Sequence, residues 1–153
     1  MGSIYLSSNR LPVFEYYIGN DKDCRILLGI GSNISVVDIS KRDLSELFPR
    51  AMSTGIITDV MSANGCVQSN IYLIPVFYIA EMTVINLPVA VANLSKFKCD
   101  MILSSAIFSN NALSIDCSAR HLSVTTGIMR TIDCVIYEEN GIFKGCDYKL
   151  IKT

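Results

Sequence analysis

The side chains able to act as nucleophiles or metal ligands are few and widely spaced. Six cysteines lie at positions 24, 66, 99, 117, 134 and 146, and His121 is the one histidine. No two cysteines form a C-x-x-C pair, so the closely spaced ligands of a zinc site are missing and we expect no metal and no cofactor. Cys117 precedes His121 by four residues, which leaves a Cys–His nucleophile as an alternative to a surface histidine.

The composition excludes several classes of protein. The chain has 153 residues, of which 50% are hydrophobic and 18% charged, and its net charge is −1. Because no basic run is present, the charge pattern of a nucleic-acid-binding protein is missing. The amino-terminal residues lack a basic region followed by an apolar one, so no secretory signal is expected. We therefore expect reduced cysteines, buried mostly as small apolar residues, in a cytoplasmic protein.

One segment, residues 71–94, is long and apolar enough to be compared with a membrane span. It contains Glu81, whose charge would be costly at the centre of a bilayer, and it is interrupted by Pro75 and Pro88. Valine, isoleucine and tyrosine are abundant in it, which favours β-structure. The segment therefore predicts two strands separated near Ala80 and Glu81, and no membrane partner.

A short glycine turn, Gly29-Ile30-Gly31-Ser32, joins two apolar segments. A dinucleotide-binding G-x-G-x-x-G loop would need a third glycine where Ile34 stands, and it would open a helix. The residues that follow, Ile34 to Val37, are typical of a strand instead. A phosphate-binding P-loop is also excluded, since no Gly-Lys-Ser/Thr follows.

The rest of the chain predicts many short strands and little helix. Asn64-Gly65 and Asn140-Gly141 are typical of tight hairpin turns. Ser40 to Phe48 predicts a short helix that Ser40 would cap, and Ala106 to Asn110 predicts one helical turn. Strands are expected at 13–18, 24–28, 34–37, 56–61, 66–74, 82–92, 101–103, 112–116, 121–125, 132–137 and 142–150. This pattern is typical of an all-β barrel or sandwich.

The order of these motifs resembles the retropepsin-like aspartic proteases, the retroviral and gag-polyprotein type. Here "ILLGIGSNISVV" stands where the family would read "ILLDTGSNISVV", and "DMILSSAIF" stands where it would read "DMILG" and an apolar helical turn. The resemblance extends from Val13 to Val124. It implies a closed β-barrel with one or two short helices in a single domain spanning 1–153, with a family-like core at about 13–125 and a carboxyl-terminal hairpin extension at 130–151. It also implies a peptide-binding flap hairpin with its turn at Ser62, Ala63, Asn64 and Gly65.

The departures from the family motifs fall on its catalytic position. Gly29 stands where the catalytic aspartate would be, and Ile30 replaces the Thr or Ser beside it, while Gly31 and Ser32 are kept. In the second motif Ile102 and Leu103 are kept, and Ser104 replaces the glycine.

In the family, two such carboxylates share a proton and activate a water molecule between them, one acting as base and the other as acid. Glycine offers neither charge nor proton, so no catalytic residue is intact at this position.

Three functions follow as hypotheses. The first is a catalytically inactive pseudoprotease that binds a peptide or protein and, by analogy with the family, forms a homodimer. The second is an active aspartic endopeptidase that uses a displaced carboxylate; the carboxylates considered are Asp38, Asp59, Asp100 and Asp116. The third is an unrelated small β-barrel that acts as an interaction or inhibitor protein.

Overall fold

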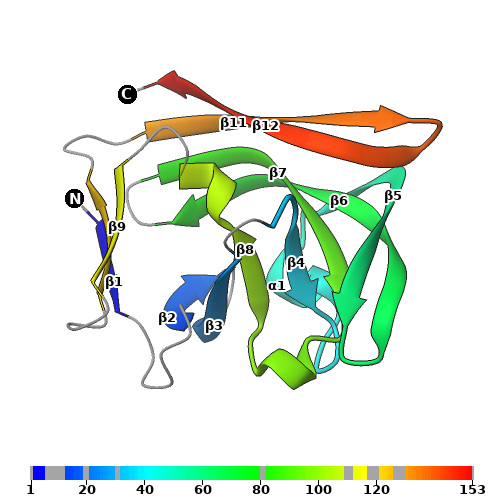
Figure 1. The fold of residues 1–153 in the computed structure, drawn as a ribbon, viewed down its shortest axis with the longest axis horizontal. Coiled ribbons are helices and arrows are strands. Elements are labelled where there is room, and N and C mark those ends of the chain that lie inside the picture. Colours follow the sequence, from blue (N-terminus) through cyan, green and yellow to red (C-terminus); the bar gives the residue numbers. More distant parts are fainter. Residues whose placement is uncertain are drawn as a thin grey trace.

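The structure is a computed structural model that describes the backbone of residues 2–5, 13–18, 21–29, 32–79, 82–108, 112–116, 121–125 and 130–152, and the side chains of 24–29, 32–79, 82–108 and 131–151. Figure 1 shows a mostly β fold. The helical turns are α1 (Leu44–Leu47), η1 (Ser95–Phe97) and η2 (Ser105–Phe108). The strands are β1 (Gly2–Tyr5), β2 (Val13–Ile18), β3 (Asp21–Gly29), β4 (Ser35–Asp38), β5 (Met52–Ser62), β6 (Gly65–Ile79), β7 (Met82–Ala92), β8 (Met101–Ser104), β9 (Ala112–Asp116), β10 (His121–Thr125), β11 (Arg130–Glu139) and β12 (Ile142–Lys152).

The predicted all-β class is confirmed, and so is the division of the long apolar segment into two strands. β6 and β7 are antiparallel neighbours, with Ile79 opposite Met82. The predicted helix is shorter than expected and begins later. Asp43, not Ser40, is its N-cap, and the main-chain N–H of Asp43 donates to the Glu46 carboxylate at 3.3 Å. Ser40 instead donates its hydroxyl to Asp38, the last residue of β4.

Five strands close into a barrel in the order β11, β12, β5, β6 and β7. The closing contact is a parallel pairing of β11 with β7, in which Arg130 lies opposite Met82 and Asp133 opposite Ile85. In Figure 1 the carboxyl-terminal hairpin, orange to red, lies along β7. The predicted hairpin at 130–151 is present, and its two strands form part of the barrel wall. The same nine-stranded sheet continues from β7 through β4, β8 and β3 to β2.

The two predicted hairpin turns form by different geometries. Asn140 and Gly141 both have positive φ, 55° and 80°, between the paired residues Glu139 and Ile142, as a type I′ turn requires. In the β5–β6 hairpin the two loop residues are Ala63 and Asn64, and the positive φ of 100° falls on Gly65. Gly141 is therefore a turn residue, whereas Gly65 is the first residue of β6.

β4 is buried on both faces and separates two apolar clusters. Val37 belongs to the larger cluster together with Leu28 and Leu103, whereas Val36 packs in the smaller one with Ile34. Successive side chains of a strand point to opposite faces, so adjacent residues can both be apolar where both faces are covered. Val36 and Val37 therefore face opposite clusters, and the buried Ser35 beside them accepts a hydrogen bond through its hydroxyl. A separate three-stranded sheet has the order β1, β10, β9.

Candidate functional site

The two motif segments that the sequence singled out lie side by side. β3 and β8 are parallel neighbours, and their last residues, Gly29 and Ser104, are register partners. β8 is also antiparallel to β4, with Val36 opposite Ile102. Leu28 and Leu103, the residues just before the two strand ends, are both buried. Two segments separated by about half the chain are thus held together by a strand pairing and a shared core.

Serine hydroxyls join the ends of these strands. The Ser104 hydroxyl donates to the main-chain oxygen of Ser32 at 2.6 Å, and the Ser104 N–H donates to the Ser35 hydroxyl at 3.0 Å. The N–H of Ser32 donates to the Gly29 oxygen at 3.2 Å, which closes the turn. Ser35 was not singled out from the sequence, because a serine at the start of an apolar strand gives no local signal of this contact. Ile30 and Gly31, also predicted site residues, lie outside the described residues.

The backbone at Gly29 is too closely surrounded for a side chain. A Cβ atom at this position would lie 2.9 Å from the Ile102 Cγ2 atom and 2.9 Å from the Ser32 Cβ atom. Contacts that short require the neighbours to move. The absence of a side chain at Gly29 is therefore part of how this junction packs, and a carboxylate would not fit here without rearrangement.

Among the residues whose side chains are described, two carboxylates, Asp38 and Asp100, are buried, and both lie at the opposite end of β8. Asp100 precedes the strand, and its N–H donates to the Arg25 oxygen at 2.7 Å. Asp38 ends β4, and its N–H donates to the Asp100 oxygen at 2.8 Å. Asp100 and Ser104 are four residues apart on an extended strand, which places their backbones about 13 Å apart.

Both carboxylates already have structural partners. Asp38 accepts from the Leu94 N–H at 2.8 Å and from the Ser40 hydroxyl at 2.9 Å. Asp100 accepts from the Arg25 N–H at 2.8 Å and from the Arg42 guanidinium at 3.3 Å.

The other two carboxylates considered from the sequence belong to strands that do not contain the Gly29 turn. Asp59 is exposed on β5, opposite Gln68. Asp116 is the last residue of β9, and its side chain lies outside the described residues. None of the described carboxylates is thus brought to the Gly29 turn by a hydrogen bond or a register pairing.

The hairpin turn predicted as a flap is bonded to the body of the protein. The Ala63 N–H donates to the Asn93 oxygen, just after β7, at 2.7 Å. Ser62 is buried, donates its hydroxyl to the Gly65 oxygen at 2.8 Å and accepts from the Asn64 N–H at 3.1 Å. A main-chain hydrogen bond therefore holds this turn to the residue that follows β7.

The cysteines differ in their surroundings. Cys24, Cys99 and Cys134 are buried, Cys66 is exposed and Cys146 is intermediate. Cys117 lies outside the described residues, and of His121 only the backbone in β10 is described.

Tyr148 from β12 packs in the same apolar cluster as Leu28 and Leu103. Burial raises the pKa of the Tyr148 phenol. The hairpin therefore packs next to the Gly29–Ser104 junction.

Cys99 gives a testable pH dependence. Burial, followed by the negative charges of Asp100 and Asp38, raises the pKa of the Cys99 thiol from 9.0 to about 12. The unfolded chain therefore loses this proton first, so the contribution of Cys99 to stability is fully present below about pH 9 and is lost as the pH rises toward about 12. In urea unfolding between about pH 8 and pH 11, Cys99→Ala should show a shallower decline than the unmodified chain. An equal decline in both proteins would contradict this assignment.

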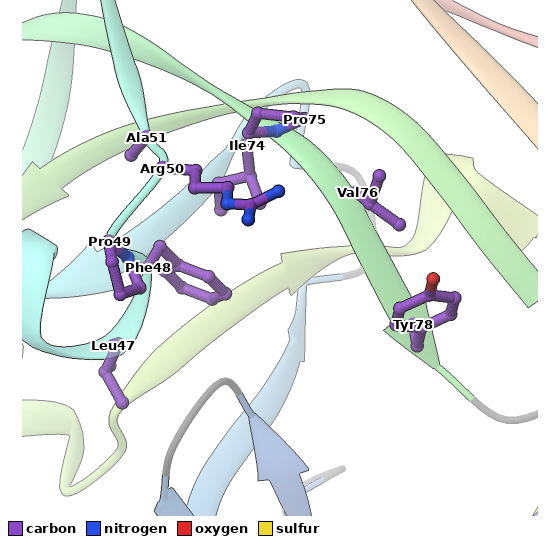
Figure 2. A pocket seen from close by; sticks show the side chains of 9 residues that line it. All are labelled: Leu47, Phe48, Pro49, Arg50, Ala51, Ile74, Pro75, Val76 and Tyr78. Carbon is purple, nitrogen blue, oxygen red and sulfur yellow. The ribbon is translucent and has the colours of Figure 1, made fainter.

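Phe48 and Ala51 both line each of two cavities among the described residues. One, of about 380 Å³, is lined by the segment from Leu47 to Ala51 and by β6 residues including Ile74 and Tyr78. Figure 2 shows that the Arg50 side chain extends toward Ile74 and that Phe48 lies below it. The other, of about 330 Å³, lies between α1 and Tyr72. Neither is lined by the Gly29 turn, the Ser62–Gly65 turn or Ser104.

Within the part of the chain that the structure describes, no group of three or more His, Cys, Asp or Glu side chains is placed to hold a metal ion. Over the same residues no helix has the length and apolar character needed to cross a membrane. The fold and this junction define an all-β protein with a closed five-stranded barrel. Comparison with family models, curated proteins and solved structures gave no match to this chain.

Proposed function

We propose that this chain is a retropepsin-like protein without proteolytic activity, which acts by binding a peptide or protein. The observation that carries the proposal is the register pairing of Gly29 with Ser104. It joins the two segments that resemble the family motifs, and neither residue is an acid. A buried, hydroxyl-joined junction without a carboxylate is what we expect of a scaffold kept after catalysis was lost. By analogy with the family, the proposal includes a homodimer, and the expected reduced state of the cysteines adds a cytoplasmic location.

The displaced-carboxylate hypothesis has less support. Asp38 and Asp100 accept hydrogen bonds from main-chain N–H groups at the far end of β8. Moving either carboxylate to the turn would leave those buried donors without an acceptor, which is costly.

A second candidate function is supported by the barrel itself. The carboxyl-terminal hairpin closes it through β11 and β7, and the Ala63 N–H anchors the predicted flap turn at Asn93. Both features suit a small β-barrel interaction or inhibitor protein unrelated to proteases. On either proposal the chain functions by binding.

A cleavage assay separates binding from catalysis. We expect the purified chain to leave a quenched fluorescent peptide library uncut between about pH 4 and pH 7, because the general base that activates water is worth about 10²–10⁴ in rate and is absent. Product formation would be followed by fluorescence and by mass spectrometry.

The controls are variants at the carboxylates. Cleavage that persists through repurification and is lost in Asp59→Asn would establish the displaced-carboxylate enzyme and overturn the proposal. Cleavage that is unaffected by Asp59→Asn would instead point to Asp116, and Asp116→Asn would be assayed next under the same conditions.

A further inference from the structure

The second half of β6 has a strand edge that no described strand pairs with. β5 pairs with β6 only as far as Met52 opposite Leu73, whereas β6 continues to Ile79. Ile74 and residues 76–79 pair with β7 on one side. On the other side, no main-chain hydrogen bond from a described residue reaches them. Six extended residues leave an edge of about 20 Å, along which alternate N–H and C=O groups point outward.

An apolar groove runs beside this edge. It is the 380 Å³ cavity, and its lining includes Phe48, Pro75 and Val76. The side chains of Val76 and Tyr78 are 46% and 65% exposed, respectively. Natural proteins cover or charge such edges, because an uncovered apolar edge is a template for another strand.

Arg50 is the one charged residue among the described residues that line this groove. Arg50 follows Pro49 in a tight turn that is closed by the Ala51 N–H, which donates to the Phe48 oxygen at 3.1 Å. Arg50 forms no ion pair with any residue that the structure describes. An unpaired guanidinium at the rim of an apolar groove favours a ligand that brings a carboxylate.

We propose that the β6 edge at residues 74–79 binds an extended peptide by strand addition, with its carboxylate on Arg50. Main-chain pairing would supply affinity, while apolar side chains at every second position would contact the groove beside Val76. A second copy of this chain fits less well, because the sequence from Ile74 to Ile79 holds no acidic residue to meet Arg50. A self-pairing would also place Pro75, which cannot donate a hydrogen bond, on both strands.

The test is selection of a phage-displayed nonapeptide library on the full chain. We expect enrichment of peptides with apolar residues at alternate positions and one Asp or Glu. Selection on Arg50→Glu should enrich Lys or Arg at that acidic position. By fluorescence polarisation, a selected acidic peptide should bind Arg50→Glu about three- to tenfold more weakly than the unmodified chain.

A matched pair of variants locates the site. Val76→Lys places a charge on the open edge, whereas Val67→Lys places it on the same strand where β5 covers it, at a side chain that is 37% exposed. Val76→Lys should abolish binding, and Val67→Lys should leave it unchanged. N-methylation of alternate peptide residues should also abolish binding, because it removes the main-chain donors.

Three outcomes would overturn the proposal. One is a library that yields no enriched sequence, and another is a selected peptide that binds Val76→Lys as well as the unmodified chain. The third is a dimer in sedimentation equilibrium that Val76→Lys dissociates, since a second copy would then occupy the edge. This inference goes beyond the proposed function. If Val76→Lys abolishes peptide binding, the edge is the binding site whether or not the chain cleaves peptides. If peptide binding survives in Val76→Lys, this inference fails but the proposed function does not.

Discussion

Replacing Gly29 by alanine should lower the free energy of unfolding by about 1–3 kcal/mol, the usual cost of overpacking a filled site. A Cβ atom there would lie 2.9 Å from both the Ile102 Cγ2 and the Ser32 Cβ atoms. Neither neighbour is the free end of a long side chain, so the strand ends themselves would have to shift. Urea unfolding of the two proteins at one pH measures the effect.

Gly145→Ala is the matched control. Gly145 also lies in a strand, but a Cβ atom there would meet nothing within 4 Å, so its substitution should change stability by less than about 0.5 kcal/mol. Ile102→Ala removes one of the two close contacts at Gly29. In that background Gly29→Ala should cost less, by about 0.5–1.5 kcal/mol of coupling between the two sites. Equal costs for Gly29→Ala and Gly145→Ala would show that the junction is loosely packed.

This result bears directly on the proposed loss of catalysis. Gly29→Asp combined with Ile30→Thr would restore the family motif in sequence, yet the carboxylate would meet the same close contacts as alanine. We therefore expect this double variant to be destabilised and to leave the peptide library uncut unless Ile102 is also shortened. Restored cleavage in the double variant alone would show that the junction adapts readily.

Removing the carboxylate of Asp38 should be the other large effect, about 2–4 kcal/mol of unfolding free energy in Asp38→Ala. The Asp38 side chain is only 3% exposed, and it accepts from the N–H of Leu94 and from both the N–H and the hydroxyl of Ser40. A hydrogen bond to a charged group contributes about 1.5–3 kcal/mol, and a buried donor left unpaired adds its own cost. Chemical denaturation gives the value directly.

Asp59→Ala controls for the loss of a negative charge. Asp59 is exposed on β5, so this substitution should lie within about 0.5 kcal/mol of the unmodified chain. Asp38→Asn, which keeps one acceptor oxygen, should fall between the two. If Asp38→Ala were no more costly than Asp59→Ala, the carboxylate would be free for another role, and the displaced-carboxylate hypothesis would regain support.

Most of the strands could be predicted from the sequence, because local alternation and turn residues specify them. Asn140-Gly141 is an example, since its two residues supply the positive φ angles of the turn. The capping residue of α1 was predicted wrongly as Ser40. The Ser40 hydroxyl donates to the Asp38 carboxylate instead, and the pattern of helix-start residues does not reveal this hydrogen bond.

The contents of the candidate site could be predicted only in part. The sequence shows that no acid stands at Gly29 or Ser104. It does not show that Ser35 would accept the Ser104 N–H, or that Arg50 would lie unpaired beside an open strand edge. These contacts join residues far apart in the chain, so their spacing in sequence carries no signal of them.

The sequence by itself determined the chemical groups available and the β character of the chain, because both depend on residue type and short-range pattern. The tertiary structure alone decided where those groups lie. It paired Gly29 with Ser104. It also assigned Asp38 and Asp100 to main-chain donors and made the carboxyl-terminal hairpin a wall of the barrel. The physical reason is that strand pairing and burial are set by packing between distant segments, whose gain in free energy exists only when the whole sheet has formed.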